Sequence, residues 1–407
     1  MPDDPRATYT PDTYRFEWDD AEIIFDRLRE GRDHALTAEV IINTALPPTP
    51  GLLHHATLNL TSTTTRKALC ATLKDQAPDI DWYVLIETAC HLSLTRWREG
   101  EEVVDLAQVP YEGRLPYLLP PIVLASAPTV LFGEGGLGKS MLALFWSLNV
   151  PCKVLYLDWE WEPSEHAQRM RALCDGNPPR DKVFYRRETA SLPEASAAIR
   201  RRIGELGIGM VVIDSLGLAR GGEPENAEVT LRLFTAIRSL GVPALCLDHM
   251  TKDAKDKKHS FGSIYTYNSA RMVWRLDAVK AADGNTDLAL TNTKANGRYE
   301  KRQGYHMRVD SDDDGMLASI EFESCDPLSL DGLITSMKRR DQIASAIKAA
   351  GRAISVEDIR QILADEGVVV SHANIRAQLN RHKGGMFNQT GIDGGEILWG
   401  MAAHADV

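Results

Sequence analysis

The sequence predicts an α/β fold with a mainly parallel core sheet, a helical N-terminal region and a small C-terminal domain. Two observations support this prediction. Between residues 128 and 292, strand-like apolar runs alternate with helix-like segments, as in sheets built from successive strand–helix units. At the first such junction, residues 133–140 read Gly-Glu-Gly-Gly-Leu-Gly-Lys-Ser and fit the P-loop pattern at every required position.

The P-loop segment lies where a buried strand would pass into a helix, since apolar residues 128–132 precede it and residues 141–148 favour a helix. Glycines let the backbone turn tightly and direct N–H groups inward, where a helix N-terminus also attracts a polyphosphate. We therefore predict that Lys139 neutralises the β- and γ-phosphates of ATP and that Ser140 offers a hydroxyl to Mg²⁺. The predicted nucleotide-binding residues are Gly133, Glu134, Gly135, Gly136, Leu137, Gly138, Lys139, Ser140 and Met141.

Composition limits the class of protein. The 407 residues are 43% hydrophobic and carry a formal net charge of −11, which is typical of a globular protein of two or three domains. No apolar run reaches the length of about 18 residues that spans a membrane, and the acidic start is unlike a targeting peptide. We expect a cytoplasmic protein without a membrane partner, whose nucleic-acid sites are local patches. The six cysteines form no C-x-x-C pair, which favours reduced thiols.

The N-terminal region, residues 1–110, is predicted to be mainly helical and to serve packing or oligomerisation. A module that contacts DNA or a partner is the alternative. Its predicted helices lie at residues 19–28, 36–43, 65–73 and 82–94.

The central domain, residues 111–328, follows a connector rich in proline. Its predicted strands lie at 128–132, 153–158, 182–185, 210–214, 243–248, 272–276 and 287–292. Its predicted helices lie at 139–148, 163–174, 193–206 and 226–240.

An acid ends the apolar strand at 210–214. Asp214 would lie at the carboxyl edge of the sheet beside the P-loop, where it accepts a hydrogen bond from Ser140 or from water on Mg²⁺. Ser140 and Asp214 are therefore the predicted metal-site residues. The alternative is a strand end with no such role.

Three acids follow the strand at 153–158. A carboxylate at that edge can orient or deprotonate the water that attacks the γ-phosphate. Glu160 is the predicted base, with Asp158 and Glu162 as alternatives. The neighbouring tryptophans are expected to pack rather than to stack on a base.

The strand at 243–248 leads to His249, which faces the same edge. We predict that His249 reports the presence of the γ-phosphate, with a structural histidine as the alternative. The polar loop that follows is predicted to line a nucleic-acid channel, with a solvated surface loop as the alternative. Its lysines are Lys252, Lys255, Lys257 and Lys258.

A cluster of cations follows the strand at 287–292. Phosphoryl transfer is accelerated by a cation that meets the developing charge, often from a neighbouring subunit. Lys294 and Arg298 are predicted for this role, and plain surface charge is the alternative. The acidic turn at 310–315 departs from the EF-hand spacing, so no calcium site is predicted.

Together these motifs resemble those of the RecA-like ATPases of the RepA type, the hexameric replicative helicases of plasmids and phages. The resemblance covers about residues 115–325 and implies a ring or filament with ATP between subunits. It implies Glu160 as catalytic base, His249 as phosphate sensor, and Lys294 or Arg298 acting in trans. The helix after the P-loop is shorter than in those helicases, and the N-terminal region is unfamiliar. The segments that match are the P-loop, Glu160 with Arg169, residues 211–215, 248–252, Gly262 and Ser263 with Arg271, and 293–297.

Residues 329–407 are predicted to form three helices and a hairpin, an order that resembles a winged helix-turn-helix. The helices are expected at 336–350, 355–366 and 371–382. The third would read DNA, and Arg376, Arg381 and Lys383 would contact it. Docking of a protein partner is the alternative.

The motifs predict a Mg²⁺-dependent ATPase, and the resemblance implies an oligomer, a hexameric ring or a filament, that acts on single- or double-stranded DNA. We expect a helicase or translocase in the replication or recombination of a phage or mobile element. The alternatives are an ATP-gated DNA-binding regulator without translocation and a recombinase-like filament-forming ATPase. The predicted catalytic residues are Lys139, Glu160, Asp214, His249, Lys294 and Arg298.

Overall fold

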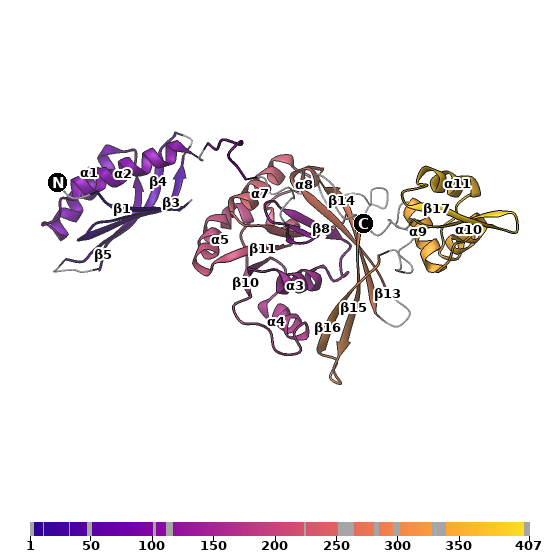
Figure 1. The fold of residues 1–407 in the computed structure, drawn as a ribbon. Helices are drawn as coiled ribbons and strands as arrows, with labels where there is room; N and C mark the ends of the chain where they lie inside the picture. The colour runs from indigo at the N-terminus through magenta and orange to yellow at the C-terminus, as the bar shows by residue number, and fades with distance from the viewer. Residues whose placement is uncertain are drawn as a thin grey trace. The chain divides into compact units, whose positions relative to one another are not determined.

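A computed structural model describes most of the chain (Figure 1). The chain divides into two units, residues 1–113 and 114–407, and this division lies close to the boundary predicted between residues 110 and 111. The second predicted boundary, between residues 328 and 329, stays a prediction. The described residues are 4–10, 12–31, 33–46, 51–100, 103–110, 117–223, 225–250, 264–280, 285–295, 302–327, 330 and 339–402.

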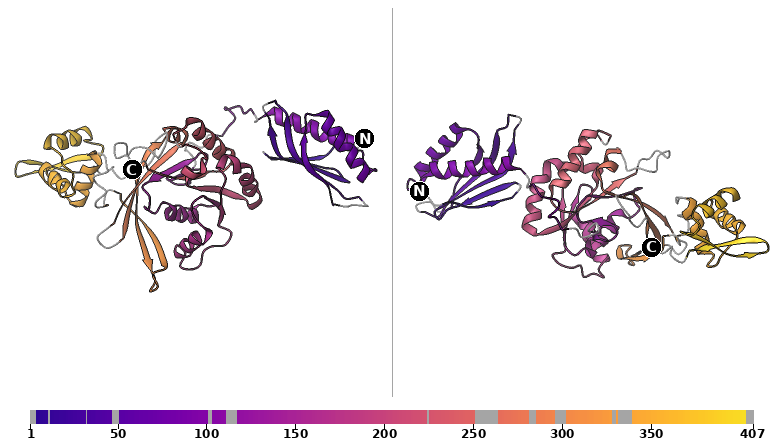
Figure 2. Two further views of the ribbon diagram at one scale, coloured as in Figure 1. Left: turned by 180° about the vertical axis from the view of Figure 1, so that it is seen from behind. Right: turned by 45° about the horizontal axis from the view of Figure 1, so that its top comes forward.

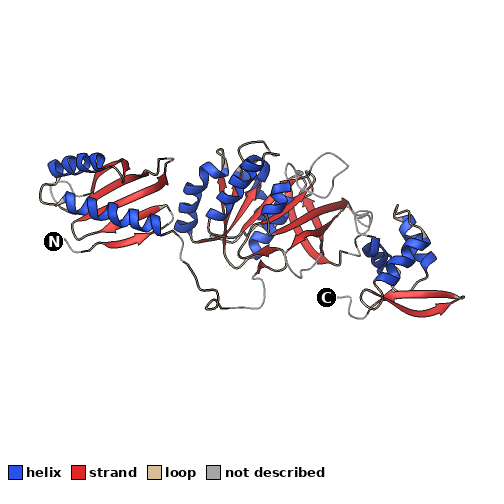
Figure 3. Cartoon of the chain, turned by 90° about the horizontal axis from the view of Figure 1, so that it is seen from above, coloured by secondary structure: helices blue, strands red, loops and turns tan. Residues whose placement is uncertain are grey.

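The first unit is an antiparallel sheet with the strand order β1-β2-β3-β4-β5 and two helices on one of its faces (Figures 1 and 3). Both helices begin at a capping side chain, Ser62 for α1 and Asp81 for α2, as their start signals require. The elements are β1 (Arg6–Tyr9), β2 (Thr13–Glu17), β3 (Ala21–Glu30), β4 (Leu36–Thr44), β5 (Gly51–Asn59), α1 (Thr63–Gln76) and α2 (Trp82–Glu99).

The predicted helices at 19–28 and 36–43 are wrong, because these segments form β3 and β4. Along β4 every second residue is buried, and in β3 the buried Ile23 and Phe25 flank the partly exposed Ile24. A period of two places one set of side chains on the core face of a sheet. The region is therefore not mainly helical, although the helices expected at 65–73 and 82–94 are confirmed as α1 and α2.

The second unit contains a nine-stranded sheet with the order β10-β9-β11-β12-β8-β13-β14-β15-β16. The strands from β10 to β13 in this order pair in parallel, and the last three are antiparallel. This confirms the predicted α/β class with its mainly parallel core sheet. The strands are β8 (Thr129–Gly133), β9 (Lys153–Asp158), β10 (Val183–Arg187), β11 (Ile208–Asp214), β12 (Ala244–His249), β13 (Met272–Lys280), β14 (Thr286–Ala295), β15 (Arg302–Ser311) and β16 (Leu317–Cys325), with the short β6 (Tyr117–Leu119) and β7 (Val123–Leu124) forming a separate pair.

Helices cover both faces of this sheet (Figures 1 and 2). In β9, Val154 and Tyr156 pack in the cluster of α3 and α4, whereas Leu155 and Leu157 pack in the cluster of α5 and α7. Burial on both faces explains why the parallel strands read as continuous apolar runs. The helices are α3 (Lys139–Asn149), α4 (Pro163–Ala172), α5 (Leu192–Leu206), α6 (Leu216–Ala219), α7 (Ala227–Ser239) and α8 (Ile264–Ser269).

The chain ends in three helices and a hairpin, as predicted. The helices are α9 (Arg339–Ala349), α10 (Val356–Asp365) and α11 (His372–Arg381), and the hairpin joins β17 (Phe387–Asp393) to β18 (Glu396–Met401). Ile343, Ile359, Ile375 and Trp399 share one buried cluster, so the four elements have a common core. Among the helices of the described ranges, none has the length and apolar character needed to cross a membrane.

Candidate functional site

Four neighbouring strands, β9, β11, β12 and β8, bring their carboxyl ends to one edge of the core sheet. The P-loop follows β8 at this edge. Gly136 and Gly138 have φ of +79° and +85°, a left-handed backbone that side chains disfavour. A Cβ on Gly133 would lie 2.7 Å from the carbonyl oxygen of Leu276, so only glycine fits there. The loop conformation therefore depends on the glycines of the motif.

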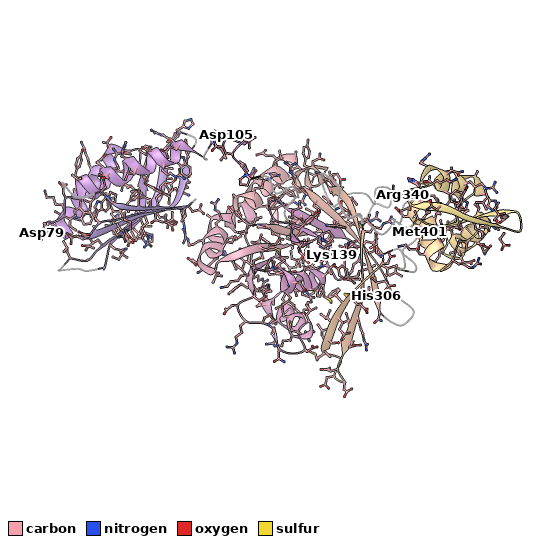
Figure 4. The ribbon with its side chains drawn as sticks, viewed as in Figure 1. Asp79, Asp105, Lys139, His306, Arg340 and Met401 are labelled. Atoms are coloured by element: carbon pink, nitrogen blue, oxygen red, sulfur yellow. The ribbon has the colours of Figure 1, made fainter. Side chains whose placement is uncertain are left out.

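Lys139 begins α3, and only 8% of it is exposed (Figure 4). Its Nζ donates to the carbonyl oxygens of Gly133 and Glu134 at 2.9 and 2.7 Å. Burial lowers the pKa of Lys139, although the carboxylates of Asp214 and Asp248 oppose this effect. The cation is thus held at the inner side of the P-loop.

Ser140 and Asp214 meet as predicted, with Ser140 Oγ donating to Asp214 Oδ2 at 2.7 Å. Tyr156 Oη donates to the same oxygen at 2.6 Å from the neighbouring strand β9. Burial raises the pKa of Asp214, while the hydrogen bonds from Tyr156 and Ser140 act to lower it. Tyr156 was not predicted as a site residue. The one feature of the sequence that could have indicated it is a hydroxyl group within a buried apolar strand.

The side chain of Glu160 contacts residues at the ends of β11 and β12. Ser215 Oγ donates to Glu160 Oε1 at 2.7 Å, and His249 Nε2 lies 3.5 Å from the same oxygen. The contact with His249 is the largest cause that lowers the pKa of Glu160, and the same contact raises the pKa of His249. A carboxylate with a lowered pKa is ionised at neutral pH and can accept a proton.

The two alternative acids have other surroundings. Asp158 is fully buried and hydrogen-bonded to His166 at 2.7 Å, whereas Glu162 pairs with Arg187. Neither arrangement leaves a carboxylate beside Ser215 and His249. The geometry therefore favours Glu160 as the base.

The neighbouring tryptophans pack in different ways. Trp159 donates its indole N–H to the carbonyl of Ala190 at 2.8 Å. Trp161 is 45% exposed. The guanidinium carbon of Arg169 lies 5.6 Å from the centroid of the Trp161 ring. Trp159 thus packs against the core, as expected from the sequence.

A buried ion pair lies behind His249. Asp248 Oδ2 is 3.7 Å from Arg220 Nη2, and Asp248 Oδ1 accepts the backbone N–H of His249 at 3.0 Å. Burial raises the pKa of Asp248 to about 6, and Arg220 acts against this rise. Arg220 was not predicted, because its partner comes from a strand distant in the sequence.

Lys294 belongs to β14, and its side chain reaches the C-terminal end of α8 in the same chain. Its Nζ donates to the carbonyl oxygens of Tyr267, Asn268 and Ala270 at 2.7, 2.9 and 2.7 Å. Burial lowers the pKa of this amine. The ammonium thus satisfies carbonyl groups at a helix C-terminus, which supports a role within its own chain. The other predicted cation, Arg298, and the loop lysines Lys252, Lys255, Lys257 and Lys258 lie outside the described residues.

The predicted DNA-contacting residues lie on and after α11. Arg376, Arg381 and Lys383 are all exposed, and Lys383 Nζ donates to Gln389 Oε1 at 2.8 Å. Cations of this helix are therefore accessible to an anionic partner.

A cavity of about 670 Å³ lies between α3, α4 and β10 rather than at the P-loop. Tyr156, His166 and Tyr185 line it, so it adjoins the site through residues that contact Asp214 and Asp158. In the described ranges no group of three or more His, Cys, Asp or Glu side chains could hold a metal ion. The oxygens of Ser140 and Asp214 would then bind Mg²⁺ only together with oxygens of a nucleotide.

Residues 103–255 match a family model described as an AAA domain. No curated protein matches the chain. Among solved structures, a KaiC-like protein of Pyrococcus horikoshii has 17% identity and a TM-score of 0.37, covering 49% of this chain and 91% of its own. The flagellar accessory protein FlaH of Methanocaldococcus jannaschii has 15% identity and a TM-score of 0.35, covering 49% and 90%. The AAA-domain match spans the P-loop, Glu160, Asp214 and His249, so the core is that of a P-loop ATPase.

Proposed function

We propose that this protein is a Mg²⁺-dependent ATP hydrolase that assembles into an oligomer and acts on DNA. Within that class we propose a helicase or translocase in the replication or recombination of a phage or mobile element. One observation supports hydrolysis most strongly: Ser140, Asp214 and Glu160 come from three separate segments and meet beside the P-loop.

The residues present fit ATP and Mg²⁺. Gly135 and Gly136 are exposed, and a Cβ at either position would meet no atom within 4 Å, so the tip of the loop is not covered by other parts of the described chain. Backbone N–H groups of such a loop and the start of α3 bind phosphate oxygens. Ser140 and Asp214 supply the hydroxyl and carboxylate oxygens that Mg²⁺ prefers. Bound with ATP, Mg²⁺ would neutralise charge on the β- and γ-phosphates.

Lys139 and Glu160 have complementary parts in hydrolysis. The Lys139 ammonium, now bonded to two loop carbonyls, would transfer those hydrogen bonds to phosphate oxygens. Glu160 would orient the attacking water and accept its proton at the carboxylate that Ser215 holds. The lowered pKa of Glu160 keeps this acceptor ionised.

His249 is suited to sense the reaction. Its imidazole contacts Glu160, and its backbone N–H is held by Asp248, which pairs with Arg220 next to α6. A change at the γ-phosphate that moves Glu160 would therefore reach β12. We propose that residues 251–263, which follow β12 in the sequence, pass the change to DNA.

Action on DNA is supported by the exposed cations Arg376, Arg381 and Lys383 on a domain of three helices and a hairpin. In a winged helix this surface would face phosphates and base edges. The same surface supports the alternative function, a DNA-binding regulator whose ATPase core switches assembly without translocation.

Assembly is supported by the need for a cation at the γ-phosphate. We propose that Arg298 comes from a neighbouring subunit of a ring or filament, because Lys294 is bonded to carbonyls of its own chain.

The experiment that tests this function measures ATP hydrolysis with and without single-stranded DNA, together with strand displacement on a forked duplex. Stimulated hydrolysis with displacement supports the motor. Duplex binding at a preferred sequence without displacement supports the regulator. Full hydrolysis by the Lys139→Ala variant would contradict both.

A further inference from the structure

A single buried carboxylate holds the chain just after β9. Asp158 Oδ1 accepts the backbone N–H groups of Glu160 at 2.8 Å and Trp161 at 3.3 Å. Asp158 is 0% exposed, so water does not compete for these bonds. The turn formed by residues 158–161 therefore sets the backbone position from which the side chain of Glu160 projects.

His166 holds the second oxygen of this carboxylate. Its Nε2 lies 2.7 Å from Asp158 Oδ2, and the residue, which comes from α4, is only 3% exposed. The ring lies between those of Tyr156 and Tyr185, with centroid distances of 4.6 and 5.5 Å. In the described part of the chain, His166 Nδ1 has no hydrogen-bond partner. The polar contact of this ring is thus directed at Asp158.

Tyr185 contributes less to Asp158. Its Oη is 3.3 Å from Asp158 Oδ2 but 2.6 Å from the carbonyl oxygen of Trp161. A hydroxyl has one proton, and the shorter contact is the stronger hydrogen bond. His166 is therefore the main donor to Asp158 Oδ2.

The charge on Asp158 is consistent with this arrangement. Burial acts to raise the pKa of Asp158, but the hydrogen bonds from His166 and the two backbone N–H groups outweigh it and lower the pKa. The carboxylate is ionised at neutral pH and accepts hydrogen bonds at both oxygens.

We propose that His166 is a positioning residue for Glu160: it holds Asp158, which in turn holds the backbone of Glu160. This inference rests on the proposed role of Glu160 as the general base. A base displaced by about 1 Å can lose about 10²-fold in rate. Nucleotide binding depends on the P-loop, so the loss of His166 should change turnover and leave ATP affinity unchanged.

The test begins with His166→Phe, which keeps a flat ring between the two tyrosines and removes the N–H donor. We expect kcat to fall about tenfold or more, with the KM for ATP and the affinity for a fluorescent ATP analogue unchanged within about twofold. His166→Gln keeps a side-chain N–H donor and should recover part of the rate. His306→Phe is the control for the loss of a His–Asp pair elsewhere in the chain, because His306 Nδ1 pairs with Asp287 on β14 at the same 2.7 Å. It should keep the wild-type kcat.

Combination with Glu160→Gln separates positioning from a general structural role. If His166 acts through Glu160, His166→Phe should lower the remaining rate of Glu160→Gln by less than about twofold. An equal loss in both backgrounds, a parallel loss of nucleotide affinity, or a wild-type kcat for His166→Phe would overturn the inference. Should the Phe variant not fold, Asp158→Leu removes the same contact from β9 together with both accepting oxygens and is judged by the same criteria. Wild-type turnover by Glu160→Gln alone would instead contradict the proposed function.

Discussion

Ser140 Oγ lies 2.7 Å from Asp214 Oδ2, although the two residues are 74 positions apart in the chain. The contact joins the first turn of α3 to the end of β11, two strands from β8 in the sheet. It places a hydroxyl and a carboxylate where Mg²⁺ would bind together with a nucleotide.

Replacing Ser140 with alanine should impair the use of Mg²⁺. The variant loses one oxygen ligand, so we expect ATP hydrolysis to fall at least about tenfold at limiting Mg²⁺ and to recover partly at higher Mg²⁺. Ser147→Ala is the control, because Ser147 lies on the same helix and its hydroxyl bonds only to the carbonyl of Ala143 in the described contacts. An unchanged Mg²⁺ dependence in Ser140→Ala would argue against the site.

The contact between Glu160 and His249 should make stability depend on pH. The lowered pKa of Glu160 adds stability above about pH 4.5, and the raised pKa of His249 adds stability below about pH 6.5. The contribution is therefore complete between these values, is lost toward acid through Glu160, and is lost toward alkali through His249. The difference in Tm between the wild type and His249→Ala should be largest in this window and smaller at pH 8. A difference that does not change with pH would refute the pairing.

Tyr156→Phe removes the 2.6 Å hydrogen bond to Asp214 and leaves the ring packed. A hydrogen bond to a charged group contributes about 1.5–3 kcal/mol, so urea unfolding should show a loss of that order. Tyr305→Phe serves as the comparison, because Tyr305 Oη has a longer contact, 3.4 Å, with Trp146. Tyr305→Phe should lose less free energy of unfolding than Tyr156→Phe. Equal losses in the two variants would show that the hydroxyl of Tyr156 has no special role.

Charge reversal on α11 should weaken DNA binding without changing the fold. Arg376 and Arg381 are exposed, so Arg376→Glu and Arg381→Glu should leave Tm and basal ATP hydrolysis nearly unchanged. If each arginine contacts a phosphate, each substitution also reduces the salt slope of DNA binding by about 1. Arg352→Glu is the control, because Arg352 is also exposed but lies before α10 and not on α11. DNA affinity equal to that of wild type in both α11 variants would exclude this helix as the DNA-binding element.

The two predicted cations should differ in where they act. Lys294→Met removes three donors to the carbonyls at the end of α8 and should cost about 1–3 kcal/mol of stability. Arg298→Ala should be inactive alone but regain activity when mixed with Glu160→Gln subunits, because some interfaces then carry both wild-type residues. Absence of recovery in mixed oligomers that are shown to form would place Arg298 outside the active site.

The core sheet and the approach of Asp214 and Glu160 to the P-loop could be predicted from the sequence for a physical reason. P-loop geometry depends on glycines at fixed spacing, and Asp214 and Glu160 each follow an apolar strand whose end must lie at the same sheet edge. In the N-terminal region, by contrast, the short apolar run at Ile23 fits a helix as well as a strand, and only pairing with β2 and β4 decides for the strand.

Other contacts depend on which strands become neighbours. Tyr156 reaches Asp214 because β9 lies beside β11, although α4, β10 and α5 separate the two strands in the chain. Arg220 likewise meets Asp248, which lies at the end of another strand. His166 is only 8 positions after Asp158, but the contact depends on how α4 packs against the sheet. No local spacing records such partners, so these residues could be found only from the structure.

The role of Glu160 as general base is tested most directly by single-turnover hydrolysis of ATP with Glu160→Gln, measured alongside ATP affinity. Glutamine keeps the size of the side chain and can still accept from Ser215, but it cannot take a proton from water. We predict wild-type ATP affinity with a hydrolysis rate reduced about 10²-fold or more. Hydrolysis at the wild-type rate would contradict the account.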